Sequence, residues 1–526
     1  MPSGFAGGHF LYISARPVQP LRAQSVFCRA DTDRYIEWIS VFVCNVKFYA
    51  VFLSVFSRGP EMTNAVKYGI IKNKLIFYNF NKFNFSGSGF GRSASPAPRG
   101  GLRPCRKLKQ KVGPFMPVMH GRNLVKIKQQ NLESIKATLY RRAPLSRAEI
   151  AERLELTPPT ITNIVAELIQ QGVVQELPAS AATASHGVGR KPINLDLVPG
   201  SRLALGISLG RDYTHYCITD LRGGIRAQGT FDLMPEEYSD MIRQLLRILH
   251  KLEKRHPAEW SQLIGVGITL PGIVNPHTGV IKNLGNERTS WCNQPIGQTI
   301  SQAIHMPVRL ENNVRARACA VSLFRPQLLG DENAFAFCYV AWGIACPVVL
   351  DDRSFGGEES TAGEIGKMIL APQSSGCENC GFPGSLESIS SMRAILTRCR
   401  QALRSGQCTV LAQLCTDPDA LTFEQVLTAQ SKGDPAVREI LDNAMFFLGI
   451  ALANVVSFLN PHLILISGPP FRNQENFDTV ARSLETHAFR SSDEKLQLVH
   501  VDLGEYGGAV GAAASCIEKY FVRGSD

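Results

Sequence analysis

Apolar positions follow a helical period through residues 124–172, in three segments separated by turn signals. The apolar residues of 124–140 fall on one helical face, and Ser146 opens a capping box with Glu149 that predicts a short second helix. Thr157 and Pro158 then predict the start of a third helix, which Gly172 ends. Its stripe recurs at i, i+3, i+4, i+7 and i+8: Ile161, Ile164, Val165, Leu168 and Ile169. Two short helices joined by a tight turn predict a helix-turn-helix.

A hairpin pattern follows the third helix. Val173 and Val174 begin an extended segment, residues 178–189 are small loop formers, and residues 193–197 alternate as a return strand. Such a hairpin would form a wing beside the helices. Its Arg190 and Lys191 are candidates for contacts with a minor groove or a phosphate backbone, although a charged linker between domains would have the same composition.

The polar face of the third helix carries the candidate base-reading residues. Thr157, Thr160, Thr162 and Asn163 lie away from the apolar stripe. Asn163 could read an adenine edge, and the threonines could reach phosphates or a thymine methyl group. These residues predict double-stranded DNA as the partner, while a structural hairpin with solvated polar side chains is the alternative.

The remaining chain has the pattern of an α/β protein. Short apolar runs alternate with helical stretches, as in open and largely parallel sheets, and we expect two lobes with a cleft. The runs lie at 203–207, 264–268, 334–340 and 463–466.

Over most of residues 1–115, the apolar positions follow neither the helical nor the strand period. Their longest apolar run, from Ile36 to Phe56, is interrupted by Glu37, Asn45 and Lys47, so we predict no membrane span. We expect residues 1–118 to be disordered or an over-extended reading frame.

Composition and charge narrow the class of protein. The 526 residues are 44% apolar and 19% charged, which excludes collagenous, wholly disordered and polytopic membrane chains. The formal net charge of +11 divides into +13 over residues 1–115, +4 over 116–195 and −6 over 196–526. A general basic patch over the protein is therefore not supported, although the modest surplus of the middle segment could serve phosphate contacts. Fourteen irregularly spaced cysteines predict a reducing cytoplasm rather than a disulfide scaffold.

Several motifs in one order resemble the ROK family (repressor, open reading frame, kinase), and specifically its winged-helix regulators. They are LSRAEIAERLELTPPTITNIVAELIQQGVV, GRKP, GISLGRDYTHYCITDLRG, GVGITLPGIV, LENNVRA, STAGEIGK, CGFPGSLES and LANVVSFLNPHLILISG. The resemblance implies a winged helix-turn-helix domain over 119–198 and a two-lobed, actin-like sugar-kinase body over 199–526. Sugar and nucleotide would bind between the lobes.

The resemblance also shows where groups needed for phosphoryl transfer are replaced. The loop DxGGT of family kinases aligns with Ser208–Asp212, and the loop GTGIG aligns with a stretch in which Trp342 would obstruct the phosphates. Asn313 stands where the kinases have their aspartate base, and an amide cannot accept that proton. Pro469 and Pro470 remove backbone donors from a third loop. We therefore expect no enzyme activity and no cofactor.

The resemblance assigns sugar contacts to four positions: Asn312, Asn313, Glu364 and Glu387. Lys367 replaces a family histidine and could donate to a sugar or pair with Glu364. Both glutamates could equally be ordinary structural charges. The family zinc site is degraded to Cys377 and Cys380, which is too few ligands for a closed tetrahedron, so we predict no metal.

These observations predict a cytoplasmic transcriptional regulator, a repressor of carbohydrate-metabolism genes, whose inactive sugar-kinase-like body senses a sugar or sugar phosphate. One recognition helix covers one half-site, so a homo-oligomer of at least two chains is expected. Two alternatives remain: an ATP-dependent ROK sugar kinase, and a pseudokinase regulator controlled by a protein partner.

Overall fold

The computed structural model describes the strands of the N-terminal segment and most of the chain from residue 124 onward. The described ranges are 26–32, 35–43, 51–57, 66–71, 74–79, 124–178, 192–283, 289–330, 332, 334–350, 353–373, 382–489 and 496–524. The chain divides into two compact units, residues 1–115 and 116–526, which are described separately.

The first unit contains one antiparallel sheet with strand order β1-β2-β3-β4-β5. Its strands are β1 (Val26–Thr32), β2 (Tyr35–Val43), β3 (Val51–Ser57), β4 (Val66–Ile71) and β5 (Lys74–Asn79). The expectation that residues 1–118 are disordered or an over-extended reading frame stays a prediction, but these strands were not predicted from the sequence. The strands are rich in β-branched and aromatic residues, a composition that favours strands even where polar and apolar positions do not alternate. The apolar run 36–56 falls on β2 and β3, which pair with each other, and not on one helix.

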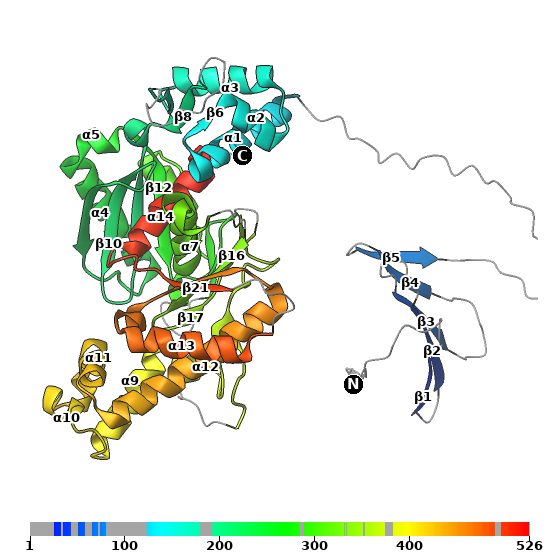
Figure 1. Cartoon of the computed structure of the whole chain (residues 1–526), viewed down its shortest axis with the longest axis vertical. Helices are drawn as coiled ribbons and strands as arrows, with labels where there is room; N and C mark the ends of the chain where they lie inside the picture. The colour runs from blue at the N-terminus through cyan, green and yellow to red at the C-terminus, as the bar shows by residue number, and fades with distance from the viewer. Residues whose placement is uncertain are drawn as a thin grey trace, which may run out of the picture. The chain divides into compact units, whose positions relative to one another are not determined.

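The second unit opens with a winged-helix domain, as predicted (Figure 1). Its helices are α1 (Leu124–Arg142), α2 (Arg147–Leu154) and α3 (Pro158–Gln170), and its strands are β6 (Leu145–Ser146), β7 (Val174–Glu176) and β8 (Asn194–Leu197). Both hydrogen bonds of the Ser146–Glu149 capping box are present. Glu155 then adopts a left-handed conformation (φ 52°), which turns the chain into α3. β8 lies between β6 and β7, both antiparallel to it, so the predicted return strand completes the wing.

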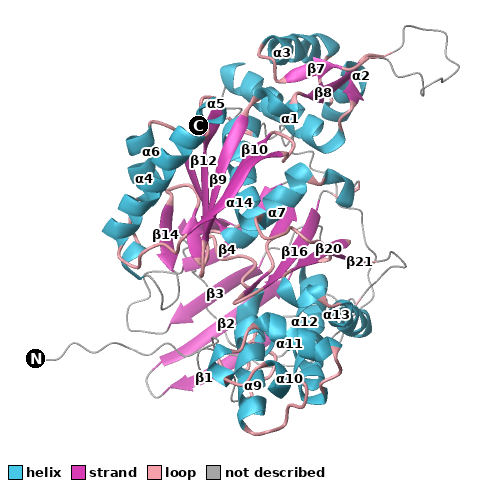
Figure 2. Ribbon diagram, turned by 90° about the vertical axis from the view of Figure 1, so that its left-hand side faces the viewer, coloured by secondary structure: helices cyan, strands magenta, loops and turns pink. Residues whose placement is uncertain are grey.

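The first lobe of the body is a five-stranded sheet of order β11-β10-β9-β12-β15. The strands are β9 (Leu203–Leu209), β10 (Thr214–Asp220), β11 (Ile225–Phe231), β12 (Leu263–Leu270) and β15 (Val308–Asn312). β12 is parallel to β9 and β15, and the β9–β10–β11 edge is antiparallel. Helices α4 (Tyr238–Arg255) and α6 (Ile296–Ile304) cover one face, while α7 (Asn313–Phe324) and α14 (Gly507–Ile517) cover the other (Figure 2). A short α5 (Pro257–Trp260) and the hairpin of β13 (Ile273–Asn275) and β14 (Val280–Asn283) complete this lobe.

Helix α14 packs directly on the sheet because two paired glycines leave room for it. Gly206 of β9 and Gly267 of β12 face each other in register. A Cβ atom on Gly206 would lie 1.9 Å from the Ala509 carbonyl oxygen, and one on Gly267 would lie 1.8 Å from the Ala512 carbonyl oxygen. The C-terminal helix is therefore part of the core of the first lobe, although it follows the second lobe in sequence.

The second lobe has a sheet of order β19-β18-β16-β20-β21, with β17 (Ile344–Ala345) paired to β16. Its strands are β16 (Ala334–Val340), β18 (Val348–Leu350), β19 (Arg353–Phe355), β20 (Leu463–Ser467) and β21 (Gln497–His500). Its helices are α8 (Leu386–Ser390), α9 (Met392–Arg404), α10 (Leu411–Leu414), α11 (Phe423–Ser431), α12 (Pro435–Leu459) and α13 (Gln474–His487). The four apolar runs singled out in the sequence are β9, β12, β16 and β20. The predicted α/β class with an N-terminal winged helix is confirmed.

Among the described residues, α12 is long and apolar enough by composition to cross a membrane. Over half of its most apolar window is buried, and its side chains belong to the core that also contains α9, α11 and α13.

Candidate functional site

Helix α3 presents a polar face to solvent and an apolar face to the winged-helix core. Ile161, Ile164, Val165 and Leu168 are buried, whereas Thr157, Thr162 and Asn163 are exposed and Thr160 is half-buried. The separation of the two faces is as predicted from the period of the sequence. An exposed face on the second helix of a helix-turn-helix is where this fold places base-reading side chains.

The threonine hydroxyls on that face already have partners within the helix. Those of Thr157 and Thr160 share a hydrogen bond of 2.9 Å, and Thr162 donates to the Pro158 carbonyl oxygen at 2.9 Å. Thr157 occupies the predicted N-cap position but makes no side-chain cap bond, because its hydroxyl is turned to Thr160. Asn163 makes no hydrogen bond to the described part of the chain, so its amide is available to a ligand. The candidates Arg190 and Lys191 lie outside the described residues.

One arginine of the body fixes the winged-helix domain. Arg222, in the turn between β10 and β11, donates to the carbonyl oxygens of Tyr140 (3.0 Å) and Leu139 (3.3 Å) at the end of α1. The same guanidinium pairs with Asp196 of the wing strand β8. Apolar residues of α1, α3, β8, α7 and α14 form a single buried cluster around this contact. The DNA-binding fold and the body therefore share a core.

The two predicted sugar-binding asparagines occupy the junction of β15 and α7. Asn312 is the N-cap of α7: its Oδ1 accepts from Val314 N–H (2.8 Å) and Arg315 N–H (3.1 Å), while its Nδ2 donates to the Gly272 carbonyl oxygen (2.8 Å). This buried amide is largely committed to the fold. Asn313 is half-buried, and its side chain has no hydrogen-bond partner in the described structure, so it is the better placed of the two to meet a ligand.

Arg315 is a residue that the sequence analysis missed. It is buried, and its Nη2 donates to the carbonyl oxygens of Ser360 (2.6 Å) and Ala362 (3.3 Å). It therefore links the Asn312–Asn313 junction to the loop that carries Glu364. An arginine three positions after an N-cap asparagine was the available signal, but its partners are backbone atoms that no side-chain pattern reveals.

Glu364, Lys367 and Glu387 form one charged cluster on the second lobe. Lys367 pairs with Glu387 at 2.5 Å. Of the two roles suggested for Lys367, a sugar contact or a pair with Glu364, the structure shows neither directly: residues 365–367 form a short 3₁₀ turn, and the ammonium pairs with Glu387 of α8. Burial raises the pKa of Glu364, Lys367 opposes the rise, and Glu387 adds to it. The cluster places carboxylate oxygens and a cation where hydroxyl groups could be recognised.

The loops that would hold a nucleotide are occupied by side chains of this chain. The Arg211 guanidinium lies 4.3 Å from the centre of the Trp342 ring, so the first and second loops stack on each other as a cation–π pair. Pro469 and Pro470 begin a 3₁₀ turn in the third loop, where they supply no N–H. Glu387 reaches the same region: a Cβ on Gly343 would lie 3.1 Å from its Oε1.

Among the residues that the structure describes, no three or more His, Cys, Asp or Glu side chains lie together as metal ligands would. Cys377 and Cys380 lie outside the described ranges, and the absence of a metal stays a prediction.

These features define a winged-helix protein with a two-lobed sugar-kinase-like body. The ROK family matches residues 204–519 and the MarR family matches residues 137–179. The chain belongs to the ROK family, as its motifs predicted.

Similar proteins are named as repressors or transcriptional regulators. The xylose repressor of Caldicellulosiruptor bescii is 26% identical over 65% of this chain and 83% of its own length. The transcriptional dual regulator NagC of Escherichia coli is 24% identical over 74% of this chain and 93% of its own.

Among solved structures, a ROK family transcriptional regulator described as a homologue of the E. coli MLC protein aligns with a TM-score of 0.64 at 26% identity, over 74% of this chain and 96% of that one. A ROK glucokinase from Streptomyces griseus aligns with a TM-score of 0.52 at 20% identity, over 59% and 98%, which concerns the fold. The predicted class, a ROK-family transcriptional regulator, is confirmed.

Proposed function

We propose that this protein is a cytoplasmic, sugar-responsive repressor that binds operator DNA as a homo-oligomer. The observation that carries the proposal is the Arg222 contact, which fixes the end of α1 and the wing strand β8 to the sugar-kinase-like body. A change in the body can therefore move both parts of the DNA-binding domain. The names of the relatives, xylose repressor and N-acetylglucosamine repressor, support a carbohydrate effector.

The DNA-contacting set in this proposal is Asn163 for a base edge, with Thr157, Thr160 and Thr162 beside it and Arg190 and Lys191 on the wing. Pro158 and Pro159 at the start of α3 remove two N–H groups that could otherwise bind a phosphate. Phosphate contacts then fall to side chains. Arg153, in the last turn of α2, is an exposed cation suited to this purpose.

The effector site in this proposal consists of Asn313, Glu364 and the Lys367–Glu387 pair, with Asn312 shaping the junction. Amide and carboxylate groups suit hydroxyls because they pair donors with acceptors. A sugar that accepts from Lys367 would compete with Glu387 for the ammonium. Such competition gives the site a way to rearrange when it is filled.

We further propose that the body lacks kinase activity. Asn313 cannot act as the base, and the adjacent Glu311 does not replace it. Glu311 is buried against Arg309, with 3.1 Å between Oε2 and Nη2, and its other oxygen accepts from Asn312 N–H. The Arg211–Trp342 stack occupies the space between the phosphate loops. Phosphoryl transfer depends on positioned donors and a base, and these residues supply neither.

The proposal is tested by sequencing genomic DNA retained by the purified full chain and by titrating a panel of aldoses, N-acetylamino sugars and their phosphates. Enrichment of a palindromic site, and release of that site by one sugar, are expected. DNA enrichment without an effect of any sugar would favour a repressor controlled by a protein partner. Failure to enrich any sequence would contradict the proposed function.

The kinase question has a separate test. Asn313→Asp restores the carboxylate, yet both phosphate loops stay blocked, so neither variant nor parent should show sugar-dependent ATP turnover in a coupled assay. Turnover by either protein would establish the sugar-kinase alternative.

A further inference from the structure

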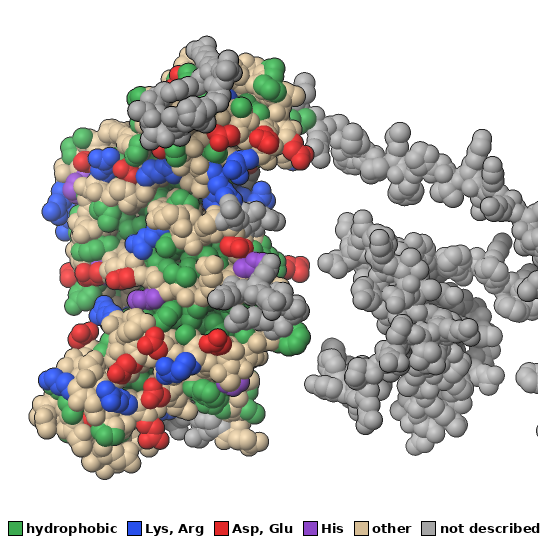
Figure 3. All heavy atoms as spheres, viewed as in Figure 1, with side chains coloured by type: hydrophobic (Ala, Val, Ile, Leu, Met, Phe, Trp, Pro, Cys, Tyr) green, Lys and Arg blue, Asp and Glu red, His purple; other side chains and the backbone are tan. Residues whose placement is uncertain are grey.

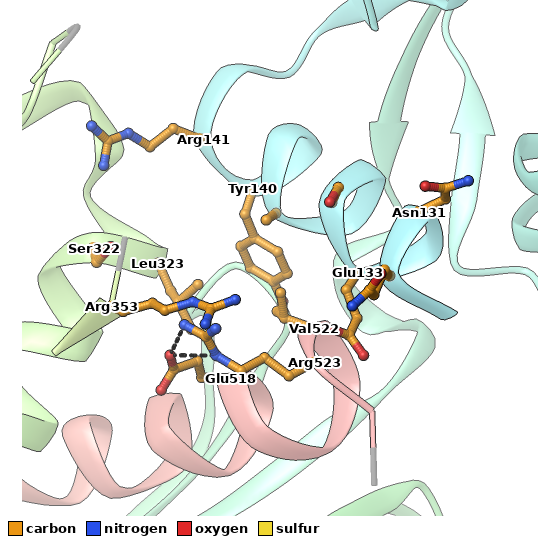
Figure 4. Close-up of a pocket in the computed structure, with 13 residues that line it drawn as sticks. Asn131, Glu133, Tyr140, Arg141, Ser322, Leu323, Arg353, Glu518, Val522 and Arg523 are labelled. Carbon is orange, nitrogen blue, oxygen red and sulfur yellow. Dashed lines mark hydrogen bonds and ion pairs between the residues drawn. The ribbon is translucent and has the colours of Figure 1, made fainter. Parts of the chain in front are cut away.

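A cavity of about 520 Å³ lies where the winged-helix domain meets the body (Figure 4). Helix α1 forms one wall. The opposite wall consists of the end of α7, Arg353 of β19 and the π-helical turn η7 (Glu518–Val522) with Arg523. Its volume falls within the range of sites for small molecules. None of the DNA-binding or sugar-binding candidates lines it.

Two hydrogen-bond donors in this cavity lack an acceptor in the described structure. The Tyr140 hydroxyl is buried without a partner, and the residue is 2% exposed. Burial raises the pKa of this phenol well above its usual value, so it stays a donor at neutral pH. The Arg353 guanidinium makes no ion pair or hydrogen bond to any described residue. Buried donors in folded proteins nearly always have an acceptor, so the buried Tyr140 hydroxyl calls for an explanation. A ligand that accepts its hydrogen bond is one such explanation.

The other charged groups of the cavity are already paired. Arg523 donates to Glu518 Oε1 through both Nε (2.9 Å) and Nη2 (2.6 Å), and Arg141 donates to the Glu332 carbonyl oxygen. Glu133 accepts from Gln129 at 3.1 Å. Arg353 and Arg523 reach the middle of the cavity from opposite sides, and Arg141 points away from them (Figure 4). Among the described residues, the cavity therefore holds a surplus of donors and one guanidinium, that of Arg353, without a counter-charge.

We propose that this interdomain cavity is a second ligand site, which takes a small anion such as a phosphate ester or a carboxylate. The anion would accept from the Tyr140 hydroxyl and the Arg353 guanidinium, and the nearby Arg523 would add to the positive potential. On the surface at the level of this joint, Lys and Arg side chains lie beside Asp and Glu side chains (Figure 3).

The position of the site links it to both functions of the chain. Helix α7 starts at the Asn312–Asn313 junction and reaches the cavity with Ser322 and Leu323. Helix α1, which carries Tyr140, leads into the helix-turn-helix. An anion between them would hold the winged-helix domain in one position on the body. This regulatory consequence depends on the proposed function, but the binding itself does not.

The test uses isothermal titration of the full chain without DNA, at constant ionic strength, with inorganic phosphate, citrate and glucose 6-phosphate as probes. We expect at least one probe to bind at one site per chain. Tyr140→Phe removes only the hydroxyl and keeps the ring against Phe521. Tyr140→Phe and Arg353→Gln should each weaken binding about tenfold, as the loss of one charge-assisted hydrogen bond does.

Two controls separate this site from others. Arg243→Gln removes an exposed arginine that pairs with Asp240 on α4 and should leave binding unchanged. With glucose 6-phosphate as the probe, a loss of binding in Glu364→Gln that Tyr140→Phe and Arg353→Gln do not share would place that probe in the effector cleft and not in the cavity. The absence of binding by all three probes, or binding that either cavity variant leaves intact, would overturn the proposal, whatever the DNA experiments show.

Discussion

Single side chains on α3 and in the cleft differ in whether their polar groups are already used. The threonine hydroxyls of α3 bond within the helix and its N-cap, and the Asn312 amide caps α7, whereas the side chains of Asn163 and Asn313 have no partner among the described residues. A polar group that is free in the fold loses nothing to intramolecular competition when a ligand binds. At the residue scale, the two free asparagines are therefore the strongest candidates for recognition.

Replacement of Asn163 by alanine should weaken operator binding by about 1–3 kcal/mol and relax the preference at one base position, because a bidentate contact to a base edge is worth that much. Alanine favours the helix, so the fold should be kept. Mobility-shift titrations against a set of single-base operator variants measure both effects. Gln170→Ala, at the exposed end of the same helix, is the control. An unchanged base preference would remove Asn163 from the reading set.

A carboxylate in the second lobe should make stability depend on pH. Asp434 accepts from five backbone N–H groups, those of Thr409, Val410, Leu411, Ala436 and Val437. Burial alone would raise its pKa, but these bonds outweigh burial and lower the pKa below 3.8. A lowered folded-state pKa contributes stability above the unfolded value and loses it as pH falls through the folded value.

Asp434→Asn should therefore cost about 3 kcal/mol at neutral pH, because its amide nitrogen would face N–H donors. The pH dependence of unfolding below about pH 4 should also become shallower. Urea unfolding at several pH values measures both changes. Asp419→Asn is the control, since that residue is 78% exposed in its pair with Arg404 and should change stability by less than about 0.5 kcal/mol. Equal effects of the two variants would show that the hydrogen bonds from backbone N–H groups to Asp434 do not stabilise the fold more than an exposed ion pair does.

At the scale of elements, local signals in the sequence predicted the winged helix well. The capping box of α2, the apolar stripe of α3 and the return strand β8 each depend on residues close together in the chain, so their pattern is visible without a fold. The Lys367–Glu387 pair and the Arg211–Trp342 stack join residues far apart, and no local period indicates them. The N-terminal strands were missed because their β-forming composition lacks a consistent alternation.

The close packing of α14 on the sheet depends on two glycines that pair across neighbouring strands, Gly206 of β9 and Gly267 of β12. Gly206→Ala would place its Cβ 1.9 Å from the Ala509 carbonyl oxygen, which belongs to the backbone and cannot move without the helix. We expect a loss of about 3 kcal/mol or more in unfolding free energy, from overpacking. Gly200→Ala is the matched control, because its Cβ would meet only the flexible end of Arg226 at 3.2 Å. Similar denaturation midpoints for both variants would contradict a rigid helix–sheet contact.

At the scale of the whole molecule, α7 contacts the winged-helix domain, the first lobe and the second lobe. Val314, Ala318 and Val321 pack against the sheet of the second lobe, while Ala320 and Leu323 belong to the core shared with the winged helix. The same helix begins at the predicted effector site. A shift of α7 when the cleft is filled would therefore be felt at the end of α1, which Arg222 also holds. In the proposed function, this packing would couple the sugar site to the DNA-binding domain without a flexible linker.

If the cleft is the sensor, the effective sugar should weaken operator binding by about 1–3 kcal/mol, and operator DNA should weaken sugar binding by the same factor, because linkage is reciprocal. Arg222→Gln removes the bonds to Leu139 and Tyr140, so it should reduce this coupling while sugar affinity in the absence of DNA is kept. Arg226→Gln is the control, since it lies on the same hairpin but pairs with Asp220 instead. Fluorescence anisotropy with labelled operator, at several sugar concentrations, measures the coupling. Full coupling in Arg222→Gln would mean that the effect of sugar binding reaches the winged-helix domain through the shared apolar core. The Arg222 contact would then only stabilise the interface between that domain and the body.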